Sequence, residues 1–310
     1  MSDVLIAEIS GKRPGGIKER PTEGFQYDYD HVIISNNSDG YQTEWDVINV
    51  PDEYVEWYKQ NVKTSESAWY APMNRSYAIK YAREHGYRYL IQLDDNIVFW
   101  EIAYKIGERS YRTSHVKGSN TDGIQNDLLE YLVDVLRFTN AGIAGMEVAG
   151  ASVPGHDFLR ERYVYSAFAL DLQRIPDYYQ GDFEDDIEFR LKLKQMSIPS
   201  VCVCPFRYGK TAQEGTKDTS GNRQAYVDAG VKRGAHMSKL YGEYYSAGMS
   251  SRGSGTRRKE GMRAFRHRLK PFKVGVKVSD YAYLESRMSE LLVKYANNKP
   301  TEFKTNVTDD

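Results

Sequence analysis

Residues 89–96 read Tyr89-Leu-Ile-Gln-Leu-Asp94-Asp95-Asn96, a short apolar run that ends in two adjacent carboxylates. The apolar residues before Asp94 predict a buried β-strand, and the polar triplet predicts a turn at its end. Two neighbouring carboxylates repel each other unless a positive charge neutralises them. A hard divalent cation with oxygen ligands is one solution, and a simple capped turn without a ligand is the alternative. The stretch therefore predicts either a cation site or a structural turn.

The sequence around this stretch alternates between strand-like and helix-like segments. The run from Ser76 to His85 predicts a helix, with Asn74 or Ser76 as its N-cap and Gly86 at its end. A second helical face is formed by Leu128, Leu132, Val135, Leu136 and Thr139. Short apolar segments predict further strands at residues 4–7, 31–35 and 45–50. Strands separated by helices predict an α/β fold with a mixed, mostly parallel sheet flanked by helices.

The loops at the ends of these strands are candidate binding sites, because open α/β sheets bind ligands outside the carboxyl ends of their strands. The loops in question follow Ile9, Ser35 and Leu93. Lys12 and Arg13, in the first of them, are placed to meet a phosphate. A solvated loop with no ligand would contain the same residue types, so both interpretations stay open.

A second acidic cluster contains Glu184, Asp185, Asp186 and Glu188. Clustered carboxylates raise one another's pKa, so one of them can act as a general base near neutral pH. The alternative is a solvated acidic helix N-terminus, which the helix dipole favours. Apolar and charged residues alternate strictly from position 187 to position 194, and this period is typical of a strand.

The run from residue 73 to residue 96 resembles the core of the GT-A glycosyltransferase fold. There an Arg/Asn pair opens a helix, a Gly ends it, and a strand leads into an acidic motif. The resemblance implies that Asn74 and Arg75 help to bind a nucleotide-sugar and that Asp94 lies near its ribose or diphosphate. It implies a divalent metal, Mn²⁺ or Mg²⁺, on Asp95, or on Asn96 if the frame shifts. The pair departs from the family order, since Asn74 precedes Arg75.

The segment from Asp185 to Phe189 resembles the acidic motif of inverting GT-A enzymes such as the chitin and cellulose synthases, where it lies on a helix. The resemblance implies that Asp186 is the catalytic base and that Asp185 supports it. A one-residue shift would give these roles to Glu184 and Asp185. It also favours a helix over the strand that the alternation indicates. Such enzymes often take a further metal ligand from a later His, and His236 and His156 are the candidates here.

The C-terminal part of the chain is strongly basic. Residues 251–280 contain ten Lys/Arg and two acids, a local charge of +8, in a chain whose net charge is −1. Cations with interleaved aromatic rings suit a nucleic-acid backbone, and a solvated basic helix is the alternative. The predicted DNA-binding residues are Arg257, Arg258, Lys259, Arg263, Arg266, Arg268 and Lys270.

The combination of GT-A-like motifs and a basic tail resembles the bacteriophage and TET/J-associated glycosyltransferases, which add sugars to hydroxymethylated pyrimidines in DNA. This resemblance implies an inverting, metal-dependent transfer from a UDP-sugar to a hydroxyl of a modified base, with DNA as the acceptor. One rival function is a transferase acting on a bacterial polysaccharide, lipid or protein. The other is a non-catalytic nucleic-acid-binding protein whose acidic residues only cap turns and helices.

Length and composition set the remaining expectations. The chain has 310 residues, of which 40% are hydrophobic, so wholesale disorder is excluded. We predict a GT-A domain over residues 1–245 and a basic, partly helical extension over 246–310. Cys202 and Cys204 alternate within one predicted strand, which favours free buried thiols over a disulfide. A signal-peptide pattern and a membrane-length apolar run are both missing from the sequence, so we expect a soluble cytoplasmic protein, in the host cell if phage-encoded.

Overall fold

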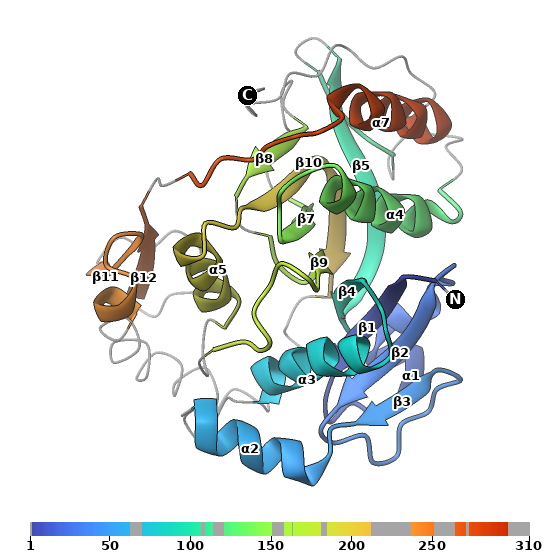
Figure 1. Cartoon of the computed structure of the whole chain (residues 1–310). Coiled ribbons are helices and arrows are strands. Elements are labelled where there is room, and N and C mark those ends of the chain that lie inside the picture. The colour runs from blue at the N-terminus through green and yellow to red at the C-terminus, as the bar shows by residue number, and fades with distance from the viewer. Residues whose placement is uncertain are drawn as a thin grey trace.

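The computed structural model is a mixed α/β fold built around one ten-stranded sheet (Figure 1). It describes residues 2–62, 70–106, 109–113, 121–150, 158–162, 164–180, 185–211, 237–250, 264–270 and 273–296. The strand order is β3-β2-β1-β4-β9-β7-β10-β5-β6, and β8 also pairs with β10. The strands of this sheet are β1 (Val4–Ser10), β2 (Asp30–Ser35), β3 (Asp46–Asn49), β4 (Tyr89–Asp94), β5 (Ile97–Ile106), β6 (Arg109–Arg112), β7 (Ile143–Val148), β8 (Leu159–Glu161), β9 (Ala167–Asp171) and β10 (Ser200–Lys210).

Helices cover both faces of the sheet, and a two-stranded sheet lies apart from it (Figure 1). The helices are α1 (Gly16–Glu19), α2 (Asp52–Val62), α3 (Tyr70–Glu84), α4 (Ile124–Arg137), α5 (Asp185–Gln195) and α7 (Tyr281–Ala296), with a 3-10 turn, η1 (Pro21–Gly24). The small sheet consists of β11 (Tyr245–Ser250) and β12 (Ala264–Leu269), which pair antiparallel. Among the described helices, none is both long and apolar enough to cross a membrane.

The predicted mixed sheet is confirmed, and its parallel part is concentrated at one side. Strands β3, β2, β1 and β4 all run parallel, and β7 runs parallel to β10. β9 is antiparallel to both of its neighbours, and β5 is antiparallel to β10 and to β6. The β1 strand is buried along its whole length, as expected for a strand covered on both faces.

Alternate residues of β1 enter two different cores. Leu5 and Ala7 belong to the core beneath α2 and α3, whereas Val4 and Ile6 belong to the core beneath α4 and α7. The second of these cores contains part of the predicted C-terminal extension, because the Tyr131 hydroxyl of α4 donates to the backbone carbonyl of Leu284 in α7 at 2.8 Å. The division of the chain at residue 245 stays a prediction.

The helix α3 begins earlier than the sequence indicates. Asn74 and Ser76 lie inside it, so neither is an N-cap, and the predicted start at Ser76 is wrong. Ser76 instead donates its hydroxyl to the carbonyl of Pro72 at 2.6 Å. Proline is tolerated in the first turn of a helix, where its missing N–H costs nothing. The predicted end is confirmed, since Gly86 has φ 80° and closes the helix in the left-handed region.

The segment from residue 185 to residue 195 is a helix, α5, as the family resemblance implies and as the alternation does not. Ile187, Phe189 and Leu191 are buried, but so are the intervening Glu188 and Arg190. Because charged side chains are also buried, the helix has no clean apolar stripe, and its period cannot be read from the sequence. The two cysteines are free and buried on β10, as predicted.

Candidate functional site

The acidic triplet, Asp94-Asp95-Asn96, lies at the edge of the sheet where the strand order reverses direction. Asp94 is the last residue of β4, and Asp95 and Asn96 form the turn into β5. β1 runs beside β4 with Ile9 opposite Asp94, so the end of β1 at Ser10 adjoins this turn. From β1 the chain builds β2 and β3 on one side and returns to β4 on the other. Such a switch point is where open α/β sheets bind ligands.

Both carboxylate oxygens of Asp95 accept hydrogen bonds. Ser10 Oγ donates to Oδ2 at 2.8 Å, and Arg13 Nη1 donates to Oδ1 at 2.7 Å. Burial raises the pKa of Asp95 to about 6, with a further rise from the charge of Asp94, while Arg13 and the Ser10 hydroxyl act in the opposite direction. Asp95 is therefore a buried carboxyl whose ionised form depends on its partners.

Asp94 is held by two cations. Arg75 Nη2 donates to Oδ1 at 2.5 Å, and Lys210 Nζ donates to Oδ2. Burial alone would raise the pKa of Asp94, but the charges of Arg75 and Lys210 outweigh it and hold the pKa well below its usual range. The two adjacent carboxyls therefore differ widely in acidity, which is common at functional sites.

Three cations thus converge on the acidic pair from three elements. Arg13 comes from the loop after β1, Arg75 from α3 and Lys210 from the end of β10. The sequence predicted Arg13 and Arg75 for this edge of the sheet. It missed Lys210, whose signal was only a single lysine after a long apolar strand.

Hydrogen bonds of side chains and of the backbone fix the loop and the helix around these cations. Asn74 Nδ2 donates to the carbonyl of Ser10 at 2.9 Å and to Asn36 Oδ1 at 3.2 Å, so α3 ties together the carboxyl ends of β1 and β2. Lys12 has φ 59°, and its N–H donates to the carbonyl of Asn37 at 3.0 Å. Its side chain is exposed at the same edge. Lys12 and Asn74 are therefore gathered with Arg13 and Arg75 as expected.

Thr22 fixes the backbone of the acidic turn, and no sequence pattern points to this role. Its hydroxyl donates to the carbonyl of Asp94 at 2.8 Å and accepts from the N–H of Ile97 at 3.0 Å. The N–H of Thr22 itself donates to the carbonyl of Asp95 at 3.4 Å. These contacts from η1 hold both ends of the turn in place.

A buried ion-pair group lies below the turn. Arg20 is fully buried and pairs with Glu23 at 2.9 Å and with Glu8 at 3.5 Å. Its guanidinium also donates to the carbonyl of Arg13 at 3.0 Å, so it supports the loop that carries the site cation. Burial raises the pKa of Glu8 well above its ordinary value, and the charge of Asp95 adds to this rise.

The residues of the acidic turn do not fit a divalent cation as they stand. Every carboxylate oxygen of Asp94 and Asp95 already accepts a hydrogen bond from a cation or a hydroxyl. Asn96 has a buried Oδ1 without a hydrogen-bond partner among the described residues, but one neutral oxygen is a weak ligand set. No third acid, His or Cys among the described residues gathers with Asp94 and Asp95. The two candidate histidines, His236 and His156, lie outside the described residues.

The predicted base lies at the start of α5. Asp185 and Asp186 are its first two residues, and the N–H of Ile187 donates to Asp186 Oδ1 at 2.9 Å. The positive end of the helix dipole favours the ionised carboxylate at this position. The Asp186 side chain is partly exposed, so it is accessible to a ligand.

Two chains of contacts connect α5 to the strand that ends in Asp94. Phe189 stacks on Tyr179 with ring centroids 4.1 Å apart, and the Tyr179 hydroxyl donates to Gln92 Oε1 of β4 at 3.0 Å. Arg190 lies 4.8 Å from the ring centre of Tyr165. The next residue, Ser166, has φ 60° and accepts the N–H of Asp94 at 2.8 Å. The two acidic clusters therefore belong to one packed unit.

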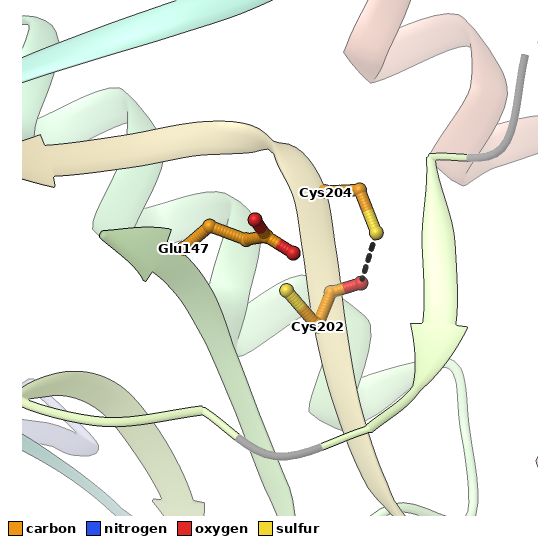
Figure 2. A group of neighbouring side chains, drawn as sticks. All are labelled: Glu147, Cys202 and Cys204. Carbon is orange, nitrogen blue, oxygen red and sulfur yellow. Dashed lines mark hydrogen bonds between the residues drawn. The ribbon is translucent and has the colours of Figure 1, made fainter. Parts of the chain in front are cut away.

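A separate group of metal-ligand side chains lies on β7 and β10. Figure 2 shows Glu147 turned toward Cys202 and Cys204, and the ligand atoms of the three lie within 4.8 Å of one another. Glu147 is paired with Arg162 and, at 3.8 Å, with Arg207. Burial raises the pKa of the Cys202 thiol well above its ordinary value, whereas the hydrogen bond with Cys202 lowers the pKa of the Cys204 thiol. The carboxylate of this group is therefore already ion-paired with two arginines.

The predicted DNA-binding residues are described only in part. Arg266 and Arg268 lie on β12, and Lys270 follows that strand. The side chains of Arg268 and Lys270 are exposed. Lys270 donates to the carbonyl of Gly242, so it also joins β12 to the segment before β11. The other residues predicted for this role, Arg257, Arg258, Lys259 and Arg263, lie outside the described residues.

Comparisons with known proteins add little to this site. No protein-family model matches the chain, and no curated protein matches it. One solved structure that it resembles is described as "putative nucleotide-diphospho-sugar transferase from Desulfovibrio desulfuricans G20", with 9% identity and a TM-score of 0.33. The match covers 68% of this chain and 83% of the other. A likeness of this size assigns neither fold nor activity.

Proposed function

We propose that the protein is a glycosyltransferase that takes its sugar from a nucleotide-sugar, with UDP as the expected nucleotide. The observation that carries this proposal is the arrangement of Asp94, Asp95 and three cations at the switch point of the sheet. Cations at the carboxyl ends of strands suit a diphosphate, which carries the largest charge of any part of such a donor. The exposed Lys12 adds a fourth positive charge at the same edge.

The proposed reaction is a direct displacement with inversion at the sugar. The acceptor hydroxyl oxygen attacks the anomeric carbon, and Asp186 takes the proton of that hydroxyl. The bond between the anomeric carbon and the diphosphate oxygen breaks, and its electron pair leaves with the diphosphate. The cations of the acidic turn then stabilise the charge that develops on the leaving group. Asp185 supports the base as its neighbour on α5.

The proposed acceptor is a hydroxymethylated pyrimidine in DNA. Its support is the local charge of +8 over residues 251–280 and the exposed Arg268 and Lys270 on the basic hairpin, meaning β11, β12 and Lys270. Phosphate contacts from such residues provide affinity without base specificity. A base within a duplex would have to leave the stack before its hydroxyl could reach Asp186.

Label transfer tests donor, acceptor and metal together. Purified protein is incubated with radiolabelled UDP-sugars and with either hydroxymethylated or plain duplex DNA, in Mn²⁺ or in EDTA. We expect label on hydroxymethylated DNA only. Label on a polysaccharide, lipid or protein instead of DNA would leave the transferase proposal in place and reject its acceptor. DNA binding with no sugar transfer and no nucleotide binding would favour the non-catalytic rival.

A further inference from the structure

We propose that Arg13, Arg75 and Lys210 hold the donor diphosphate directly, in the role that a divalent cation plays in metal-dependent transferases. This inference rests on the proposed function and concerns the same site. It differs from the sequence-based expectation of Mn²⁺ or Mg²⁺ on Asp95. The reason is that the carboxylates of the acidic turn are already occupied by the protein's own cations.

The charge balance at the turn favours an anion over a second cation. Two carboxylates face three side-chain cations, which leaves a formal charge of +1 when both acids are ionised. A divalent ion on Asp95 would lie beside Arg13, 2.7 Å from the same carboxylate, and would have to displace it. A diphosphate would instead be attracted by all three cations. An acidic turn that binds a metal ion needs a net negative charge, whereas this turn together with its three cations has a net positive charge.

The cations are exposed enough to reach a ligand. The side chains of Arg13 and Lys210 are 31% and 25% exposed, and that of Arg75 is 11% exposed. An Arg presents several N–H donors in a planar fork, so it can keep one carboxylate contact while it binds a phosphate oxygen with another donor. In this arrangement Asp94 and Asp95 act as positioning residues, because they hold the cations in place before the ligand binds.

The structure brings Lys210 to the turn through a close contact of two strands. A Cβ at Gly209 would lie 2.0 Å from Phe99 Cε1, so a larger residue would force the ring of Phe99 to move. The next residue pairs with the first residue of β5, Lys210 with Ile97. The N–H of Thr211 then donates to the carbonyl of Asn96 at 3.0 Å, inside the acidic turn. The end of β10 is thus anchored on both sides of Lys210.

Calorimetric binding of nucleoside diphosphates tests the inference. UDP, GDP, ADP and CDP are titrated into the full chain, once with EDTA and once with Mn²⁺. We expect at least one diphosphate to bind in EDTA with a Kd within about twofold of its value in Mn²⁺. If binding weakens tenfold or more in EDTA, the inference is wrong and the proposed function stands. If no diphosphate binds under either condition, both are wrong.

Charge-removing variants separate direct binding from a general electrostatic effect. Arg13→Met and Lys210→Met should each weaken diphosphate binding in EDTA by about 10- to 100-fold, the range for a lost charge-assisted hydrogen bond. Lys80→Met is the matched control: it removes an exposed lysine on α3 that pairs with Glu84, and it should leave the Kd unchanged. Equal weakening in all three variants would overturn the inference.

Asp95→Asn discriminates most sharply between a diphosphate held directly by the three cations and a diphosphate held through a metal ion on Asp95. It keeps the shape of the side chain and an Oδ1 that can still accept the hydrogen bond from Arg13, so Arg13 stays in place. It removes a negative charge next to the phosphate, so binding in EDTA should stay the same or tighten. A metal ligand at this position would instead make the variant lose diphosphate binding in Mn²⁺. Thermal unfolding of each variant confirms that it is folded under the conditions of the titration. A loss of binding in folded Asp95→Asn would contradict the inference.

Discussion

Lys210 and Asp94 form an ion pair although 116 positions separate them in the sequence. Their strands, β10 and β4, are not neighbours in the sheet, since β9 and β7 lie between them. The pair forms because the turn after Asp94 leads at once into β5, whose first residue, Ile97, pairs with Lys210. The acidic turn therefore connects β4, the last of the four adjacent parallel strands, to the antiparallel pair of β5 and β10.

The energetic coupling between these two residues can be measured directly. We predict that a double-mutant cycle with Asp94→Asn and Lys210→Met gives a coupling free energy of about 0.5–3 kcal/mol, as for other residues in one ion-pair network. Urea unfolding of the four proteins supplies the values. The Asp94→Asn change also removes a partner of Arg75, but that effect cancels in the cycle. Additivity within about 0.3 kcal/mol would mean that the pair contributes nothing to the folded state.

In the buried ion-pair group of Arg20, Glu8 and Glu23, we predict that substitutions of Arg20 and of Glu8 change the free energy of unfolding by different amounts. Arg20→Met should lower the free energy of unfolding by about 3–5 kcal/mol, because it leaves the buried carboxylate of Glu23 without its cation. Glu8→Gln should cost clearly less, since burial already favours the neutral form of Glu8 and the amide has nearly the same shape. Chemical denaturation at neutral pH measures both. An equal cost for the two variants would show that Glu8 is charged.

The parallel side of the sheet and its acidic turn are largely predictable from the sequence. The strands β1, β2 and β4 each contain a run of three or four apolar residues, because parallel strands are buried on both faces, and such runs stand out from their polar surroundings. The rule that ligands bind at the carboxyl ends of strands then suffices to place Arg13 and Asp95 at one edge. Both residues do lie there, in contact with each other.

The remaining parts of the site depend on contacts that no local pattern encodes. Lys210 reaches the turn only through the pairing of β10 with β5, and Thr22 reaches it through a 3-10 turn. The helical period of α5 cannot be recognised in the sequence, because Glu188 and Arg190 are buried along with its apolar residues. Asn74 looks like a helix cap, but the helix extends past it and its side chain bonds to β1. In each case the tertiary partner, and not the local sequence, decides the role.

Asn74 is predicted to be a structural residue of the site. Asn74→Ala removes two hydrogen bonds, one to the buried Ser10 carbonyl and one to the partly exposed Asn36. The free energy of unfolding should fall by about 1–3 kcal/mol. Asn61→Ala is the control, since Asn61 is an exposed helical asparagine that, within the described part of the chain, bonds only to its own helix, and it should change stability by less than about 0.5 kcal/mol. Similar losses in the free energy of unfolding for the two variants would mean that the hydrogen bonds of Asn74 do not contribute to the position of α3.

The basic hairpin, if it binds DNA, should do so with a marked salt dependence. Arg268→Gln should weaken binding to plain and to hydroxymethylated duplexes equally, because a phosphate contact carries no sequence information. It should also reduce the slope of log K against log salt by about 0.9, the value for one lost contact. Fluorescence anisotropy at several salt concentrations measures both quantities. Lys59→Gln, a change at an exposed lysine of α2, serves as the control. An unchanged slope in Arg268→Gln would exclude this residue from the DNA contact.

Asp186 should affect the chemical step and leave donor binding intact. If it takes the proton of the acceptor hydroxyl, Asp186→Asn should lower kcat by about 10²- to 10⁴-fold and leave the Kd for a nucleoside diphosphate within about twofold. Asp52→Asn is a matched change, since Asp52 is an exposed acid in the first turn of α2, where the helix dipole acts on it in the same way. A helix-capping role alone would make the two variants equivalent, with a small loss of stability and normal sugar transfer. A large fall in kcat confined to Asp186→Asn would therefore assign the base, whereas an unchanged kcat would move that role to another residue.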